Sequence, residues 1–179
     1  MTQIGTVYAE ALYTLAKEDN CTGEILKELS VLNDSFRQEP DFIRLMCAHN
    51  LTKEERCHIL DDSFRGKVNP YVLNFLKILT EKGYMRHFGD CCKAFRQAYN
   101  QDHGIVEVCA VTAVPLTTDQ SQRLAQKLAK VTGKTIDLHN RVDKSCLGGV
   151  RLDYDGKRVD DTVSQRLASI GKLLKNTVL

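Results

Sequence analysis

The chain has 179 residues, enough for one or two domains with a buried core. Hydrophobic residues make up 42% of it and charged residues 27%, a composition typical of a globular protein rather than a disordered or fibrous one. The formal net charge is only +2, with 25 basic and 23 acidic side chains interspersed, which argues against a dedicated nucleic-acid binder with a concentrated basic face.

The first hundred residues carry the 3.6-residue periodicity of helices. Ile4, Tyr8, Ala11 and Leu15 lie at i, i+4, i+7 and i+11, which is one face of a helix. Helix-start signals then recur at short intervals. They predict five more helices, beginning near Thr22, Pro40, Thr52, Pro70 and Tyr84. Six helices with short connections predict a helical bundle over residues 1–104.

From Gly104 the periodicity changes to 2, which predicts strands. We expect a covered strand over residues 105–114, a helix behind the capping box of Thr117 and Gln120, and an alternating strand over 135–142. A hairpin turns at residues 155–156, and a last helix follows Asp160. The fold class is therefore α+β, with an N-terminal six-helix bundle and a small C-terminal α/β domain with a mixed sheet over residues 105–179.

The cysteine spacing, the lack of long apolar stretches and the first residues predict how the protein is stabilised and whether it enters a membrane. The seven cysteines are odd in number and irregularly spaced, and no C-x-x-C pair occurs, which predicts free packed thiols rather than a disulfide framework or a zinc site. No stretch approaches the about 20 apolar residues of a membrane span, and no presequence features open the chain. We therefore expect any membrane role to depend on recruitment by another protein.

The motifs of common catalytic sites do not occur in the sequence. There is no phosphate loop G-x-x-x-x-G-K-[ST], no H-E-x-x-H, no G-x-S-x-G and no G-x-G-x-x-G. The five histidines are scattered, and a histidine in such a place is more often a surface or capping residue than a catalytic one. We expect no active site, no cofactor and no metal.

The predicted helix over residues 70–82 has an unusually wide apolar arc. Asn74, Lys77 and Glu81 fall in one narrow polar sector, and apolar residues occupy most of the remaining circumference. This apolar arc is much wider than the stripe of little more than about 100° that an ordinary bundle helix needs. Together with the first helix, this surface would form a groove for an amphipathic helix of a partner. In the alternative interpretation, the helix lies at the centre of the bundle and is packed on all sides. Periodicity alone favours neither interpretation.

Several segments resemble one known family over the whole chain and in the same order. They are Tyr8–Leu12 and Phe75–Gly83, and in the C-terminal half Val142–Ser145, Leu147–Val150 and Val159–Val163 with Arg166 and Leu167. On these residues the sequence resembles the delta subunit of F-type ATP synthase, whose mitochondrial equivalent is the oligomycin-sensitivity-conferring protein.

The resemblance implies a non-catalytic stator subunit in the peripheral stalk. It implies that the N-terminal domain grips the N-terminal helices of the alpha subunits and the C-terminal domain holds the C-terminal ends of the b subunits. The catalytic head then does not turn with the rotor, and proton-driven rotation is coupled to ATP synthesis. The implied location is the cytoplasmic face of the bacterial cell membrane, reached only through the complex.

The resemblance also assigns residues. Tyr8, Ala11 and Ile78 match the alpha-binding groove, and Gly149 matches a glycine of the C-terminal motif. The full expected sets are Ile4, Tyr8, Ala11, Leu15, Tyr71, Phe75 and Ile78 for the alpha-subunit helix, and Gly148, Gly149, Asp160 and Arg166 for the structural motif.

One alternative function remains at this stage, a nucleic-acid-binding or transcription adaptor built on a helical bundle. Such a protein would show a basic stripe and stacking aromatic residues on its strands. The aromatic residues of the predicted strands reduce to Tyr154. We therefore expect no nucleic-acid partner.

Overall fold

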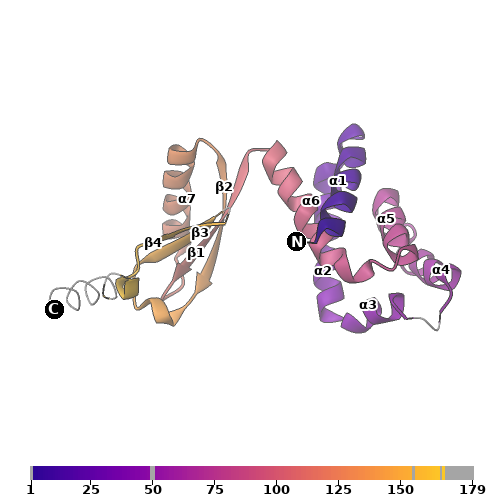
Figure 1. Cartoon of the computed structure of the whole chain (residues 1–179). Coiled ribbons are helices and arrows are strands. Elements are labelled where there is room, and N and C mark those ends of the chain that lie inside the picture. The colour runs from indigo at the N-terminus through magenta and orange to yellow at the C-terminus, as the bar shows by residue number, and fades with distance from the viewer. Residues whose placement is uncertain (1, 49–50, 155, 166, 168–179) are drawn as a thin grey trace. The chain divides into compact units, whose positions relative to one another are not determined.

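In a computed structural model, residues 2–48, 51–154, 156–165 and 167 are described, and the chain divides into two compact units (Figure 1). The units are Met1–Tyr99 and Asn100–Leu179, so the division lies close to the expected domain boundary after residue 104. The first unit is helical and the second is a small α/β structure.

The helices of the first unit begin where local sequence signals lie. Their bounds are α1 Gln3–Glu18, α2 Thr22–Gln38, α3 Pro40–Met46, α4 Lys53–Phe64, α5 Pro70–Glu81 and α6 Phe88–Asp102. At the start of α4, the Thr52 hydroxyl accepts from the Glu55 N–H and the Glu55 carboxylate accepts from the Thr52 N–H, which is the predicted capping box. At α5, the Asn69 side chain accepts from the Tyr71 N–H at 3.0 Å, with Pro70 in the first turn.

The segment after α5 differs from the prediction of one helix beginning near Tyr84. Residues Met85–His87 form a separate 3-10 turn before α6 begins at Phe88. Gly83 has φ +74°, so the chain leaves α5 in a left-handed conformation, and the His87 N–H then bonds the Tyr84 carbonyl at 2.8 Å. The turn buries Met85 completely, and this tertiary packing is not visible in the helical periodicity.

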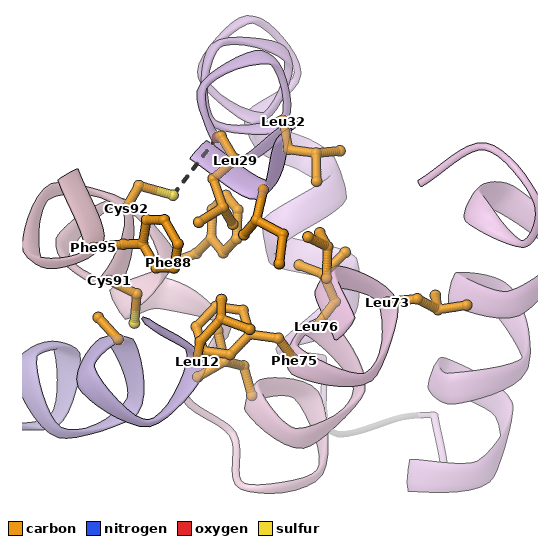
Figure 2. Close-up of a cluster of buried hydrophobic side chains, with 14 of the residues drawn as sticks. Leu12, Leu29, Leu32, Leu73, Phe75, Leu76, Phe88, Cys91, Cys92 and Phe95 are labelled. Carbon is orange, nitrogen blue, oxygen red and sulfur yellow. Dashed lines mark hydrogen bonds between the residues drawn. The ribbon is translucent and has the colours of Figure 1, made fainter. Parts of the chain in front are cut away.

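One hydrophobic core holds the helical unit together (Figure 2). Phe36 lies at its aromatic centre, with ring centroids 5.0 Å from Phe42 and 5.1 Å from Phe88. Cys91 and Cys92 of α6 are packed into the same core, and the Cys92 thiol donates to the Leu29 carbonyl at 3.7 Å. Burial raises the pKa of Cys91 to about 11 and that of Cys92 to about 12, so both remain neutral thiols at physiological pH.

The second unit is built on a four-stranded mixed sheet in the order β2-β1-β3-β4. Its elements are β1 Ile105–Thr112, α7 Thr118–Thr132, β2 Thr135–Val142, β3 Val150–Tyr154 and β4 Lys157–Asp160. The strands β1 and β2 are parallel, with α7 between them in the sequence, and the other two pairs are antiparallel. The mixed sheet agrees with the prediction. The strand β1 ends at Thr112, whose side-chain hydroxyl donates to the Val114 carbonyl at 2.7 Å.

The predicted last helix is described only at its start. The Thr162 hydroxyl accepts from the Gln165 N–H at 3.3 Å, and Asp160 accepts from the Thr162 N–H at 3.0 Å. These contacts are typical of a helix N-terminus, and the rest of the predicted helix lies outside the described residues.

Candidate partner-binding surface

Two contacts define how α1 and α5 lie against each other in the first unit. The Tyr71 hydroxyl, in the first turn of α5, donates a short hydrogen bond to the carboxylate of Asp19, the C-cap of α1. The Tyr8 ring, near the start of α1, packs edge-on against Tyr84, just beyond the end of α5, with centroids 5.9 Å apart. Because opposite ends of the two helices meet, α1 and α5 run antiparallel. The hydrogen bond to Asp19 raises the pKa of Tyr71.

Apolar side chains remain exposed on these two helices. Leu15 is 47% exposed and Ile78 is 45% exposed, and Ala11 is exposed between the two end contacts. Ile4, Tyr8 and Tyr71 are half-buried, so each presents part of its side chain to solvent. We call this set the α1/α5 strip; it consists of Ile4, Tyr8, Ala11, Leu15, Tyr71 and Ile78.

Phe75 does not belong to this surface, although the sequence analysis included it. Its side chain is only 5% exposed and its ring lies 6.5 Å from that of Phe88, inside the core. A partner therefore cannot pack against it without opening the bundle. The error has a physical cause: α5 is apolar around most of its circumference, so periodicity does not distinguish the side that faces the core from the side that faces out.

One residue of the polar sector of α5, Lys77, packs against α4, whereas Asn74 and Glu81 are exposed. Lys77 forms an ion pair with Asp61 of α4 at 2.7 Å, and both side chains are 26% exposed. This hydrogen bond to Lys77 lowers the pKa of Asp61. The sequence analysis missed this pair, because residues 16 positions apart show no local pattern. The sequence left open whether α5 forms a partner groove or is packed on all sides. Most of the helix is packed, and Ile78 faces out.

The C-terminal glycine motif joins β3 to the segment after β4. The Gly148 carbonyl accepts from the Val163 N–H at 3.0 Å, and the Val150 carbonyl accepts from the Asp161 N–H at 3.2 Å. At Gly149 φ is +80°, and a Cβ there would lie 2.5 Å from the Asp161 carbonyl oxygen. Only glycine fits such a close backbone approach.

Asp160 lies on the other side of this junction. Its carboxylate accepts from both the hydroxyl and the N–H of Thr162, and these hydrogen bonds lower its pKa. The fourth residue expected in the motif, Arg166, lies outside the described residues.

The described part of the chain was searched for metal-ligand groups, membrane-spanning helices and disulfides. No group of three or more histidine, cysteine, aspartate or glutamate side chains in it could hold a metal ion. Within the same residues, no helix is both long and apolar enough to cross a membrane. All seven cysteines are described and unpaired; three are buried and four are half-buried.

Comparison with known proteins gives a consistent result. The family model for the ATP synthase delta (OSCP) subunit matches residues 4–174. The ATP synthase subunit delta of Alkaliphilus oremlandii is 31% identical over 96% of both chains, and that of Clostridioides difficile is 28% identical over 98% of this chain and 97% of its own.

A solved structure shares the fold. A chain of the Toxoplasma gondii mitochondrial ATP synthase hexamer superposes with a TM-score of 0.76 at 18% identity, over 97% of this chain and 98% of its own.

These matches define a class, the structural subunits of the rotary ATP synthase. Within it, the chain belongs to the ATP synthase delta (OSCP) subunit family. Its function is that of a peripheral stalk subunit of the F-type ATP synthase. The family membership replaces the alternative of a nucleic-acid adaptor.

Proposed function

We propose that this chain is the non-catalytic link between the alpha/beta head and the b subunits. The first unit, as a six-helix bundle, docks on the N-terminal helices of the alpha subunits, and the second unit holds the C-terminal ends of the b subunits. The head is then kept from turning with the rotor, so that proton-driven rotation is coupled to ATP synthesis. The chain carries no active site of its own and works at the cytoplasmic face of the membrane, reached through the complex.

The observation that carries the proposal is the α1/α5 strip. Its central members Ala11, Leu15 and Ile78 are exposed, and it lies between two antiparallel helices tied together at both ends. An amphipathic helix laid along it would remove these side chains from water, which is a common mode of peptide recognition. A stator that resists torque needs slow dissociation, and a buried apolar contact between helices provides it.

The test is a titration of the 15N-labelled full chain with a synthetic peptide of the alpha-subunit N-terminus. We expect chemical shifts to move in α1 and α5. Ala11→Asp and Ile78→Asp should each weaken binding by at least about 100-fold, because each places an unpaired charge in an apolar interface at a cost of several kcal/mol.

The matched control is Val31→Asp on α2. Val31 is 65% exposed and lies outside the α1/α5 strip, so the same charge introduced there should leave the affinity unchanged. If the peptide moved no shift in α1 and α5, or if Val31→Asp weakened binding as much as Ile78→Asp, the α1/α5 strip would not be the docking surface.

A further inference from the structure

The α1/α5 strip has an uncharged middle and two different ends. At one end, which we call the Asp19 end, Asp19 bonds Tyr71. At the other, the Tyr84 end, Tyr84 packs against Tyr8. Between them the exposed residues of the strip are apolar, and Asn74, exposed on the same side of α5, is uncharged. The middle can therefore bury an apolar helix face, but it does not distinguish one direction of that helix from the other.

The Asp19 end of the strip is acidic. Glu18 and Asp19 lie three and four residues after Leu15, so they continue the face of α1 that carries the strip, and both are exposed. The hydrogen bond to Asp19 is the largest cause of the raised pKa of Tyr71, and the charge of Glu18 adds to it. Both carboxylates therefore lie close to the start of α5.

Two carboxylates of α2 lie at the same end. Burial raises the pKa of the Cys21 thiol, and the charge of Asp19 raises it further. Glu24 and Glu28 of α2 act on the same thiol in the same direction. Glu28 is fixed there, because its carboxylate accepts from the N–H of Asn69, the N-cap of α5, at 2.8 Å. Carboxylates from two helices thus collect at the Asp19 end.

The Tyr84 end carries cations on its exposed surface. Lys82 lies four residues after Ile78, so it continues the exposed face of α5. Arg86 is exposed in the 3-10 turn that follows Tyr84. One carboxylate, that of Asp90, also lies near this end, where it accepts two hydrogen bonds from the residue before α1. The side chains that a docked helix meets at the end of α5 are therefore cationic.

The remaining charged residues of α1 and α5 face elsewhere. Glu10 and Lys17 are five residues before and two residues after Leu15, which places both on the opposite side of α1. Glu81 accepts from the Cys57 thiol of α4 at 3.9 Å, so it lies on the α4 side of α5. These side chains therefore do not offset the difference between the two ends of the strip.

Helix dipoles do not offset this difference either. Because α1 and α5 run antiparallel, the C-terminus of one lies beside the N-terminus of the other, and their partial charges cancel at both ends. From Tyr8 to Asp19 the strip is about 16 Å long, whereas charges in water are screened over about 8 Å at physiological ionic strength. Each end therefore acts mainly on the nearest end of a docked helix.

From these observations we propose that the α1/α5 strip fixes the direction of its helical partner by charge. The end of the partner helix that carries cationic side chains lies at the Asp19 end, and the end that carries carboxylates lies at the Tyr84 end. The reverse direction brings like charges together at both ends. This inference rests on the proposed docking of the alpha-subunit helix and adds the charge pattern that such a helix needs.

The experiment uses the 15N-labelled full chain and two synthetic peptides with the same apolar stripe, that of an alpha-subunit N-terminal helix. One peptide has lysines in its first turn and glutamates in its last turn, and the other has the reverse. Each carries a nitroxide at its N-terminus, which broadens the amide signals near it. We expect the first peptide to broaden signals at the Asp19 end and the second to broaden signals at the Tyr84 end.

Charge reversals in the chain test the same rule through affinity. Glu18→Lys and Lys82→Glu should each weaken binding of the first peptide by about threefold to tenfold at low salt, because an attractive pair becomes a repulsive one. The matched control is Glu10→Lys, the same change on the opposite side of the same helix, which should leave the affinity unchanged. In about 0.5 M NaCl the effects of Glu18→Lys and Lys82→Glu should shrink, because salt screens exposed charges.

The outcomes separate this inference from the docking on which it rests. If both peptides bound and broadened signals at the same end, the docking surface would stand and the charge rule would be wrong. The charge rule would also be wrong if Glu10→Lys weakened binding as much as Glu18→Lys. If neither peptide moved a signal in α1 or α5, both the docking surface and the charge rule would be overturned.

Discussion

At the scale of single residues, Gly149 combines two constraints that usually occur apart. Its φ of +80° is a conformation that side chains with a Cβ rarely adopt. The space a Cβ would need is also occupied by backbone, with the Asp161 oxygen at 2.5 Å and the Thr162 Cα at 3.0 Å. Backbone atoms cannot move aside as the end of a flexible side chain can, so the close approach and the backbone conformation both require glycine.

We therefore expect Gly149→Ala to destabilise the second unit by about 3 kcal/mol or more. Gly133→Ala is the matched control, because Gly133 has φ +68° at the end of α7 but nothing within 4 Å of its Cβ position. It should lose only about 1 kcal/mol, from backbone strain alone. Urea unfolding followed by the amide signals of β1 and β3 measures both losses, and equal losses would contradict the clash.

Thr80 shows the opposite case, a side chain that weakens the fold. It is completely buried in α5, and its hydroxyl oxygen has no hydrogen-bond partner. Thr80→Val should therefore stabilise the helical unit by about 1 kcal/mol, because it removes the cost of an unsatisfied hydroxyl. Thr112→Val is the contrast, since the buried Thr112 hydroxyl donates to Val114 and accepts from Asn140. That variant should lose stability in urea unfolding, and a loss at Thr80 as well would show that its hydroxyl is satisfied.

At the scale of elements, the features predicted correctly from the sequence are local. The capping boxes at Thr52 and Thr117 and the proline at the start of α5 depend on residues within one helical turn, so their patterns are legible in the chain. The break between Tyr84 and Phe88 and the burial of Phe75 depend on packing between distant segments. Periodicity locates an apolar face but does not say which neighbour covers it.

The start of α1 illustrates a contact of this second kind, and it is sensitive to pH. The Asp90 carboxylate of α6 accepts from the Thr2 hydroxyl at 3.0 Å and from the Thr2 N–H at 3.2 Å, 88 residues away in the sequence. Both hydrogen bonds lower the pKa of Asp90, and the one from the Thr2 hydroxyl has the larger effect. A carboxyl whose pKa is lower in the folded state stabilises the fold above its unfolded pKa, and this stability is lost as the pH falls through the folded pKa.

We expect Asp90→Asn to lower the free energy of unfolding at pH 7 and to reduce its decline on acidification. The difference between wild type and variant should shrink as the pH falls below about 4, because the carboxyl of the unfolded chain is protonated first and the folded carboxyl, whose pKa is lowered, only at lower pH. Urea unfolding at several pH values measures this difference. A difference that stayed constant with pH would mean that Asp90 acts through packing and not through its charge.

At the scale of the whole molecule, the two units have separate cores. All residues of the buried cluster in the helical unit lie between Ala9 and Phe95, whereas the buried residues of the sheet include Val108, Ala110 and Val111. The family and the order of elements could be predicted because sequence motifs occur in both halves. Which side chains of α5 are exposed could not be predicted from periodicity, because the exposure of Ile78 and the burial of Phe75 are properties of the folded unit.

Separate cores predict separate stabilities. Leu76→Ala, at a fully buried position of α5, should destabilise the helical unit by about 2–4 kcal/mol. Hydrogen exchange of the full chain should then show faster exchange throughout α1–α6 and unchanged exchange in β1 and β3, because no residue of the helical core belongs to the sheet. Val111→Ala should do the reverse. If either variant accelerated exchange equally in both units, the prediction would be wrong, because the chain would then unfold as one cooperative body. In that case the stability of both units would resist a torque applied at one of them.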